Sequence, residues 1–393
     1  MNKAPFKIEL NKIADVTAGQ SPESKYYSFK EGIPFLQGNR TFGNLYPSIE
    51  VFTKKVTKWA YKNEVLLSVR APVGDLNFAP FDLCIGRGLA SLKAKNGNNK
   101  FLYYALKYNI KNLLRQGIGT TFESVNINTI NNFELIIPEL ESDRSKIASF
   151  LSSIDSKFEL NNFINTELEA MAKTIYDYWF VQFDFPDENG KPYKTSGGKM
   201  VWNEELKRDI PEGWGVGKLR DFTNIFDSKR IPLSNVQRSN MKGIYPYYGA
   251  TEIMDYINDY IFDGEYVLIA EDGSVMDEKG YPFVQFIWGK TWVNNHAHIL
   301  QAKNINNNEF LYFFLKTISV LQIMTGSIQK KITQDNLLNV VLVLPNDNLL
   351  KIYSKIVIPI RKRRMVLKEE NKQLTSLRDW LLPMLMNGQV KVK

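Results

Sequence analysis

The sequence predicts an α+β protein made of two similar mixed α/β domains and two long antiparallel helices that pair as a coiled coil. Three observations lead to this class: the length of 393 residues, an internal repeat, and two long segments with a seven-residue apolar period. A single compact core rarely grows beyond about 250–300 residues, so two or three domains are expected. The hydrophobic content of 44% and the charged content of 23% are near globular averages and exclude a disordered or fibrous chain.

An internal repeat relates residues about 200 positions apart. Phe101–Leu106, with the sequence FLYYAL, returns as Phe310–Leu315, with the sequence FLYFFL, at an offset of 209. Ile127–Pro138 likewise returns as Gln334–Pro345. Solenoid repeats are only about 20–45 residues long, so this period indicates a duplicated domain.

Each copy is expected to contain the same order of elements. A mixed block rich in aromatic and β-branched residues comes first, and Glu64–Arg70 and Glu265–Ala270 are predicted strands within the two blocks. A helix follows, at Asn99–Leu114 in one copy and Asn308–Met324 in the other, because large apolar residues recur at helical spacing. A turn that contains glycine and a short strand come next, and a long helix ends the copy.

The two final helices, roughly Ser142–Phe183 and Asn346–Asn387, carry the seven-residue period. The repeating positions are Ile147, Ile154, Asn161, Leu168 and Ile175 in the first helix, and Tyr353, Ile360, Leu367, Leu374 and Leu381 in the second. This pattern predicts a left-handed coiled coil, most simply between the two helices of one chain, and about 40 residues would span about 60 Å. Asn161 on the seam is expected to fix the register, and Pro359 is expected to end, kink or restart the second helix.

These elements set the predicted boundaries along the chain. They are a first domain at 1–142, a first long helix at 143–183, a connector at 184–213, a second domain at 214–345 and a C-terminal long helix at 346–387. The connector is rich in Gly, Pro, Lys and Asp, but it is not of low complexity. We therefore expect an ordered crossing, with a short strand at Met200–Trp202.

Composition narrows the possible functions. Lys and Arg number 50 against 42 Asp and Glu, and the resulting formal charge of +8 favours an anionic partner such as nucleic acid. The single cysteine, Cys84, excludes a disulfide framework and a multi-thiolate metal site. No apolar run approaches the roughly 20 residues that span a bilayer, and the N-terminus lacks an apolar signal core, so we expect a cytoplasmic protein without a membrane partner.

Two patterns leave a metal-dependent activity open as an alternative. Asp187 followed by Glu205 and Lys207 has a spacing like that of nucleases that hold Mg²⁺, although these residues lie in the connector. His296 and His298 share one face of a predicted strand and could bind a metal, but a third ligand is not evident. The chain has no G-x-x-x-x-G-K-[ST] phosphate loop, so it is not expected to hydrolyse ATP.

Several short segments carry a resemblance to a known family. They are Val69–Gly74, Ile85–Ala90, Ile210–Trp214, Asn294–His298, Phe185–Tyr193 and Trp380–Gly388. With the duplicated order and the paired long helices, the chain resembles the specificity subunit of type I restriction-modification systems over essentially its whole length. The resemblance implies two target-recognition domains, each reading one half of a bipartite site in double-stranded DNA, separated by helices on which two modification subunits dock.

The resemblance also implies a chain that is not an enzyme and that holds no cofactor or metal. S-adenosylmethionine would bind the methyltransferase (modification) subunits, and ATP with Mg²⁺ would bind the restriction or translocase subunits. Two alternatives remain open from the sequence: a Mg²⁺-dependent nuclease, and a coiled-coil scaffold that binds protein without DNA specificity.

The predicted DNA contacts lie in loops of the two copies. Arg70 and Arg87 are in turns rich in Gly and Pro, where a guanidinium can bond a base or phosphate through two N–H groups, and a structural salt bridge is the competing interpretation. The turn Gly117–Thr121 and its counterpart Gly326–Lys331 carry polar groups suited to phosphates and base edges, as solvated loops also do. The other predicted contacts are Thr120, Thr121, Asn295, His296, Gln329, Lys330 and Lys331.

The end of the first long helix, Met171–Phe183, is apolar on more than one face. It reaches into a recognition domain, forms a partner interface, or does both, and the resemblance implies the interface. The predicted interface residues are Met171, Tyr176, Trp179, Phe180, Leu377 and Leu381.

Overall fold

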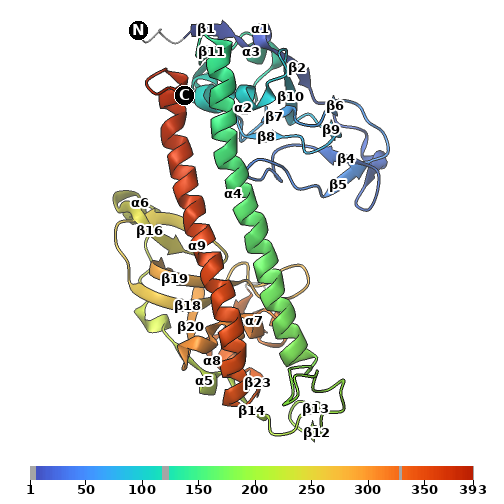
Figure 1. Ribbon diagram of the computed structural model, residues 1–393, viewed down its shortest axis with the longest axis vertical. Helices are drawn as coiled ribbons and strands as arrows, with labels where there is room; N and C mark the ends of the chain where they lie inside the picture. The colour runs from blue at the N-terminus through green and yellow to red at the C-terminus, as the bar shows by residue number, and fades with distance from the viewer. Residues whose placement is uncertain (1–5, 117–123, 327–329, 393) are drawn as a thin grey trace. The chain divides into compact units, whose positions relative to one another are not determined.

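The computed structural model describes residues 6–116, 124–326 and 330–392 and contains two compact units. The first unit joins the chain up to Phe163 with the chain from Leu367 onward, and the second unit is Ile164–Val366. The two long helices, α4 (Glu141–Tyr176) and α9 (Asp347–Met386), therefore each contribute to both units (Figure 1). The predicted class is confirmed, because each unit mixes helices with sheets and includes part of both long helices.

The described residues of the first unit form three sheets. Their strands are β1 (Phe6–Glu9), β2 (Ala14–Ala18), β3 (Tyr27–Ser28), β4 (Ile33–Leu36), β5 (Val51–Thr53), β6 (Trp59–Ala60), β7 (Val65–Ser68), β8 (Leu76–Phe78), β9 (Leu83–Ile85), β10 (Leu89–Ala94) and β11 (Glu134–Ile137). They pair in the orders β1-β11, β2-β10-β7-β8 and β3-β5-β4-β9-β6. The predicted strand Glu64–Arg70 contains β7, whose side chains are all buried, as expected of a strand covered on both faces.

The helices of the first unit cover its sheets and meet the long helices in one hydrophobic core. The shorter helices are α1 (Leu10–Ile13), α2 (Asn99–Gln116) and α3 (Ile127–Asn131). Asn126 caps α3 by accepting a hydrogen bond from the Thr129 N–H. Leu102 from α2, Leu151 from α4 and Leu385 from α9 all belong to the same buried cluster, so both long helices are integral to this unit.

The second unit repeats this plan around a larger sheet. Its strands are β12 (Met200–Asn203), β13 (Arg208–Pro211), β14 (Gly215–Lys218), β15 (Thr223–Ile225), β16 (Lys242–Tyr248), β17 (Ile253–Ile257), β18 (Phe262–Ala270), β19 (Val284–Val293), β20 (Ala297–Ala302), β21 (Met324–Thr325), β22 (Lys331–Ile332) and β23 (Val341–Leu344). The large sheet has the order β15-β20-β18-β19-β16-β17, and β14-β23, β12-β13 and β21-β22 form pairs. The predicted strands Glu265–Ala270 and Met200–Trp202 are confirmed as parts of β18 and β12.

The shorter helices of the second unit include one that differs from its prediction. They are α5 (Leu219–Phe222), α6 (Asn235–Asn240), α7 (Asn308–Leu315) and α8 (Gln334–Leu338). The predicted helix Asn308–Met324 is wrong in length, since α7 ends at Leu315. The N–H and the hydroxyl of Thr317 both donate to the Phe314 carbonyl, which closes a turn and stops the helical ladder.

The strand pairing carries the internal repeat. In the first copy Leu92 of β10 lies opposite Val65 of β7, and in the second copy Leu300 of β20 lies opposite Val267 of β18. The pair β1-β11 corresponds to the pair β14-β23. The helices α2, α3 and α4 of the first copy correspond to α7, α8 and α9 of the second. The two copies therefore share one scaffold.

Polar side chains cross the helix pair inside the first unit. Arg378 Nη1 lies 2.8 Å from Asp155 Oδ1, both side chains are buried, and the Tyr104 hydroxyl donates to the other carboxylate oxygen. Asn161 Nδ2 donates to Asn371 Oδ1 over 2.9 Å, so the asparagine predicted on the seam bonds across it. Asp155 precedes Asn161 while Arg378 follows Asn371, which makes the two helices antiparallel.

Pro359 lies inside α9 and does not end or restart it, so that part of the prediction is wrong. Its ring is on the exposed side of the helix, as is Lys355, whose carbonyl loses its helical hydrogen bond. Water can bond that carbonyl, and the helix continues. None of the described helices combines the length and the apolar character needed to cross a bilayer.

Glu309 of α7 is a buried carboxyl group in the second unit. Its nearest cation is Arg361 of α9, whose Nε lies 3.9 Å away, and neither carboxyl oxygen has a hydrogen-bond partner among the described residues. Burial raises the pKa of Glu309 to about 7, although Arg361 opposes the shift. The folded state therefore favours the protonated form.

We expect Glu309→Gln to raise the melting temperature at pH 8 and to change it little at pH 4. An unfolded glutamate titrates near 4.3, so a folded pKa of about 7 makes stability fall as pH rises between these values and stay lower above them. The loss at pH 8 is of order 3 kcal/mol, and the neutral amide avoids it. Thermal melts at the two pH values, with the exposed Glu167→Gln as control, test this, and equal shifts for Glu309→Gln at both pH values would contradict it.

Candidate nucleic-acid interface

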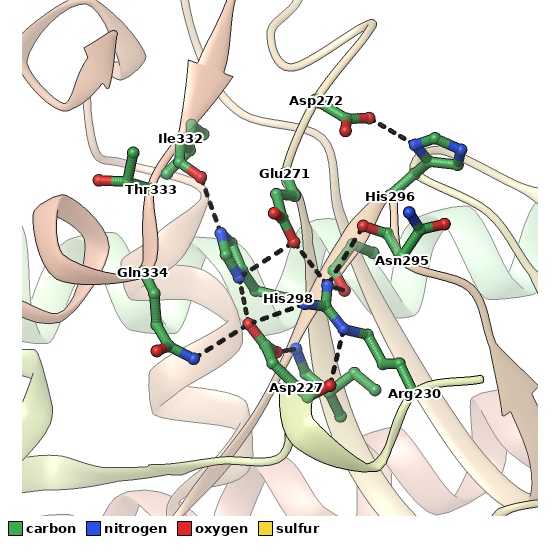
Figure 2. A network of polar contacts seen from close by, with 12 residues as sticks. Asp227, Arg230, Glu271, Asp272, Asn295, His296, His298, Ile332, Thr333 and Gln334 are labelled. Carbon is green, nitrogen blue, oxygen red and sulfur yellow. Dashed lines mark hydrogen bonds and ion pairs between the residues drawn. The ribbon is translucent and has the colours of Figure 1, made fainter. Parts of the chain in front are cut away.

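Charged side chains gather in the second unit where β15, β18, β20 and β22 meet (Figure 2). Asp227 begins the turn after β15, Glu271 follows β18, and His298 lies within β20. Lys331 begins β22. Because β15, β20 and β18 are neighbours in the large sheet, residues far apart in sequence meet at this edge.

His298 lies at the centre of this group and uses both ring nitrogens. Its Nε2 lies 2.8 Å from the Ile332 carbonyl oxygen, and its Nδ1 lies 2.5 Å from Asp227 Oδ2. Burial by itself would raise the pKa of Asp227, but the hydrogen bond and charge of His298 and the N–H of Ile299 lower it below its usual range. A carbonyl and a carboxylate are both acceptors, so each ring nitrogen of His298 faces a group to which an N–H can donate.

Two cations, Arg230 and Lys331, surround the second carboxylate, Glu271. Arg230 Nη1 lies 2.5 Å from Glu271 Oε2, and Lys331 Nζ lies 2.9 Å from Glu271 Oε1. Burial would raise the pKa of Glu271, but the hydrogen bonds of Arg230 and Lys331 lower it. Arg230 also donates to the carbonyls of Asn295 and Ala297, which ties the turn before β20 to this network.

Asp227, Glu271 and His298 have ligand atoms within 4.8 Å of one another, which is the geometry of a possible metal site. The surroundings do not suit a metal, because both ring nitrogens of His298 already face protein acceptors and Arg230 and Lys331 already pair with Glu271. His296 is not a fourth member, since its Nδ1 lies 2.5 Å from Asp272 instead (Figure 2). The group is therefore a buried ion-pair network that holds four chain segments together.

Exposed polar residues surround this network, and we call them the second rim. They are Asn295, His296, Lys330 and Lys331. The structure thus brings together four residues predicted as DNA contacts. Asn295 and His296 lie on the turn before β20 (Figure 2), and Lys330 and Lys331 lie at the start of β22. Gln329, predicted with them, lies outside the described residues.

Arg70 and Arg87 form the corresponding first rim in the first unit. Arg70 follows β7 and pairs with Ser124 in an isolated bridge, as Asp272 after β18 pairs with Lys331 in the second unit. The Arg87 N–H donates to Ser21 Oγ, and both arginine side chains are exposed. Within the described part of the chain neither guanidinium has an ion-pair partner. The predicted contacts Thr120 and Thr121 lie outside the described residues.

Among the described residues, the Asp227–His298 pair beneath the second rim has no counterpart in the first copy. Ala18 lies opposite Ala90 in the β2-β10 ladder, at the positions that correspond to Asp227 and His298. The same scaffold thus carries a pair of alanines in one copy and a hydrogen-bonded Asp–His pair in the other.

We expect His298→Ala to lower the free energy of unfolding by about 2–3 kcal/mol, because a buried group left without its partner costs about 1–3 kcal/mol. The double change Asp227→Ala with His298→Ala, which restores the pair of the first copy, is expected to cost less than the sum of the single changes by about 1–3 kcal/mol. Urea unfolding measures both. His296→Ala, which removes an exposed partner of Asp272, is the control and should cost less than about 1 kcal/mol. Additive single effects would contradict the coupling.

The predicted partner interface needs correction. Tyr176, Trp179 and Phe180 are buried in the core of the second unit, where the Phe180 ring centroid lies 4.9 Å from both Phe310 and Tyr353. The aromatic end of the helix therefore reaches into the domain, the first of the two alternatives. These three side chains are not available on the surface of the unit.

The remaining interface residues differ in exposure. Met171 is 54% exposed, Leu377 is 42% exposed and Leu381 is partly buried in the first core. Met171 and Leu377 thus keep the accessibility that a docking role requires.

The connector residues do not form a nuclease site. The Asp187 carboxylate accepts the N–H groups of Asn189 and Lys191 and closes a turn. Glu205 and Lys207 are exposed in the turn between β12 and β13. Lys207 Nζ lies 3.7 Å from Oε2 of the neighbouring Glu204. Among the described residues, the group around His298 is the one set of three potential ligands that meet.

One scaffold used twice, with a different polar rim in each copy, defines a duplicated recognition protein. A family model described as the type I restriction modification DNA specificity domain matches residues 6–170 and again residues 211–375. These matches span more than half of the chain, so the chain belongs to this family.

Individual relatives agree with the family match. The chain is 24% identical over 432 aligned residues to the type I restriction enzyme MjaIX specificity subunit of Methanocaldococcus jannaschii, covering all of this chain and 96% of the relative. It is 38% identical over 173 residues to a relative named as the MjaX specificity subunit of the same organism, but that match spans only 43% of this chain and 40% of the relative. The solved S subunit of the type I restriction-modification system from M. genitalium aligns with 98% of this chain and 97% of its own chain, with a TM-score of 0.61. The sequence identity is 18%, so this likeness shows a shared fold.

The double family match and these relatives place the chain among the sequence-specificity proteins of type I restriction-modification systems. Specificity subunits are the non-catalytic components of such systems, and catalysis belongs to their partners. The nuclease and scaffold alternatives receive no support.

Proposed function

We propose that each copy reads one half of a bipartite target in double-stranded DNA, and that the two rims make the contacts. The observation that carries this proposal is the difference between the rims at corresponding positions of one scaffold. Arg70 and Arg87 in the first copy correspond to Asp272 and Asn295 in the second. Two domains that share a backbone fold but carry different rim side chains are suited to two different half-sites.

The chemistry of the rims fits this role. An exposed guanidinium can bond O6 and N7 of guanine, and an asparagine amide can bond N6 and N7 of adenine. Lys330 can neutralise a phosphate, which gives affinity without sequence information and a strong dependence on salt, and Lys331 can donate to a phosphate while it also bonds Glu271. The network around His298 would hold Asn295 and Lys331 in place, because Arg230 bonds the Asn295 carbonyl and Glu271 bonds Lys331. Thr120, Thr121 and Gln329 remain predicted contacts from sequence alone.

The same proposal covers the partners. Two modification subunits would bind S-adenosylmethionine and dock through surfaces that include Met171 and Leu377, and the restriction or translocase subunits would supply the sites for ATP and Mg²⁺. The recognition domains would be residues 1–142 and 214–345, joined by the connector 184–213, with the long helices 143–183 and 346–387 setting the distance between half-sites. A complex that acts on chromosomal DNA would work in the cytoplasm.

Selection from a random DNA pool tests the proposal. The chain, assembled with its modification subunits, should enrich one split motif, and exchanging residues 1–142 for those of another family member should change one half of the motif. Sequencing of the selected pools measures this. Enrichment of no motif would contradict DNA reading, and a change in both halves would contradict the modular assignment.

A further inference from the structure

A groove opens in the first unit between the start of α4 and the end of α9. Its volume is about 220 Å³, and an apolar cavity of about 150 Å³ is already large enough to hold benzene. Ile147, Leu385 and Met386 line it, together with Leu140 and Val390, which are 50% and 37% exposed. No aromatic side chain lines the groove among the described residues.

The corresponding place in the second unit can be identified through the repeat. The Val390 N–H donates to the Met384 carbonyl after α9. After α4, the Asp184 N–H donates to the Tyr178 carbonyl, and both residues of this bond lie 206 positions before their counterparts. The chain that leaves α9 therefore follows the path of the chain that leaves α4.

The second unit has aromatic residues where the groove has smaller ones. At the same offset, Leu385 and Met386 correspond to Trp179 and Phe180, and Ile147 corresponds to Tyr353. These three rings of the second unit pack on one another, with centroid distances of 4.9–6.2 Å.

A further ring, Trp214, packs against this aromatic cluster of the second unit from the turn that ends the connector. Trp214 lies immediately before β14, is buried, and has its ring centroid 5.1 Å from Phe185 and 6.0 Å from Phe180. The second unit thus completes this end of its core with a turn, Ile210–Trp214, that arrives from outside the paired helices. β14 pairs with β23 as β1 pairs with β11, so the turn before β14 corresponds to the residues before β1, which lie outside the described residues.

We propose that the groove of the first unit binds an aromatic side chain carried on a turn of another polypeptide, in the way that the second unit binds its own Trp214. The apolar floor of Ile147, Leu385 and Met386 would hold the ring. Lys146 and Asp143, which also line the groove, can bond the polar backbone of the turn. This protein-binding site is separate from the two DNA rims and does not depend on the proposed function.

A labelled peptide with the sequence of residues 208–216, RDIPEGWGV, tests the site on the full chain by fluorescence anisotropy. We expect saturable binding, and at least tenfold weaker binding of the same peptide with alanine in place of tryptophan. Leu385→Trp, which places in the groove the residue found at Trp179, should fill it and weaken peptide binding at least tenfold. Because Leu385 is buried and that variant can misfold, Leu140→Asp provides a second test at an exposed position, with the same expected loss.

Leu160→Asp is the matched control, since Leu160 is an equally exposed leucine of α4 outside the groove. It should bind the peptide as the unchanged chain does. Absence of saturation up to millimolar peptide would overturn the proposal. Equal binding of the alanine peptide, or unchanged binding by Leu140→Asp, would overturn it as well.

Discussion

Asp155→Ala is expected to lower the free energy of unfolding of the first unit by about 3–5 kcal/mol, because it leaves the buried guanidinium of Arg378 without its partner. The Tyr104 hydroxyl loses its acceptor at the same time. Asp155 lies on α4, Arg378 on α9 and Tyr104 on α2, so one carboxylate joins three helices of the unit. Urea unfolding followed by circular dichroism measures the change.

Two further variants separate the cost of an unpaired charge from the worth of the pair. Asp155→Leu combined with Arg378→Leu removes both charges and is expected to recover most of the stability, because an apolar pair can replace a buried ion pair at little cost. Asp379→Ala removes an exposed carboxylate that also bonds Arg378, and it should cost less than about 1 kcal/mol. A loss under 1 kcal/mol for Asp155→Ala would show that the pair does not hold the helices together.

Arg87→Ala is expected to reduce discrimination at the first half-site by about 1–3 kcal/mol, which is roughly 5- to 150-fold in relative affinity, and to leave the second half-site unchanged. Asn295→Ala should have the reverse effect, because it lies on the other rim. Lys330→Ala should instead weaken binding to all sequences and reduce the salt dependence by about one phosphate contact. Competition binding with DNA altered in one half-site at a time, at several salt concentrations, distinguishes these results.

The control for the rim variants is Lys199→Ala, an exposed cation of the connector that lies on neither rim. It should leave discrimination at both half-sites intact. If Arg87→Ala affects both half-sites equally, or if Lys199→Ala matches it, the two rims are not separate readers.

Much of this fold follows from the sequence because the repeat and the heptads are long-range patterns. Offsets of 206–209 residues relate the helix, the strand and the heptads of the two copies, and they predict both copies and the order of their elements. The heptad period alone does not say which neighbour an apolar side chain meets. Tyr176, Trp179 and Phe180 continue the helix, but they pack on Phe310 and Tyr353 inside the second domain, so the predicted partner surface there was wrong.

The candidate site was predicted in part. Asn295 and His296 stand in one turn, and β22 brings Lys331 beside them, so loop residues singled out by their chemistry do meet. The network beneath them was missed, because Asp227 and His298 are 71 residues apart and meet only through the pairing of β15 with β20. One signal was available: the aligned copies show Ala18 and Ala90 at the positions of Asp227 and His298, so two small residues in one copy correspond to two residues in the other that can bond each other.

The first unit is assembled from two stretches of chain, with roughly 200 residues between Phe163 and Leu367. A ribosome that adds about 5–20 residues per second needs some 10–40 seconds to make this interval. Throughout that time the nascent first unit lacks the leucines of α9 that complete its core, while the second unit is contiguous and emerges whole. The contiguous second unit can therefore complete its core during synthesis before the first unit can, although the first unit begins nearer the N-terminus.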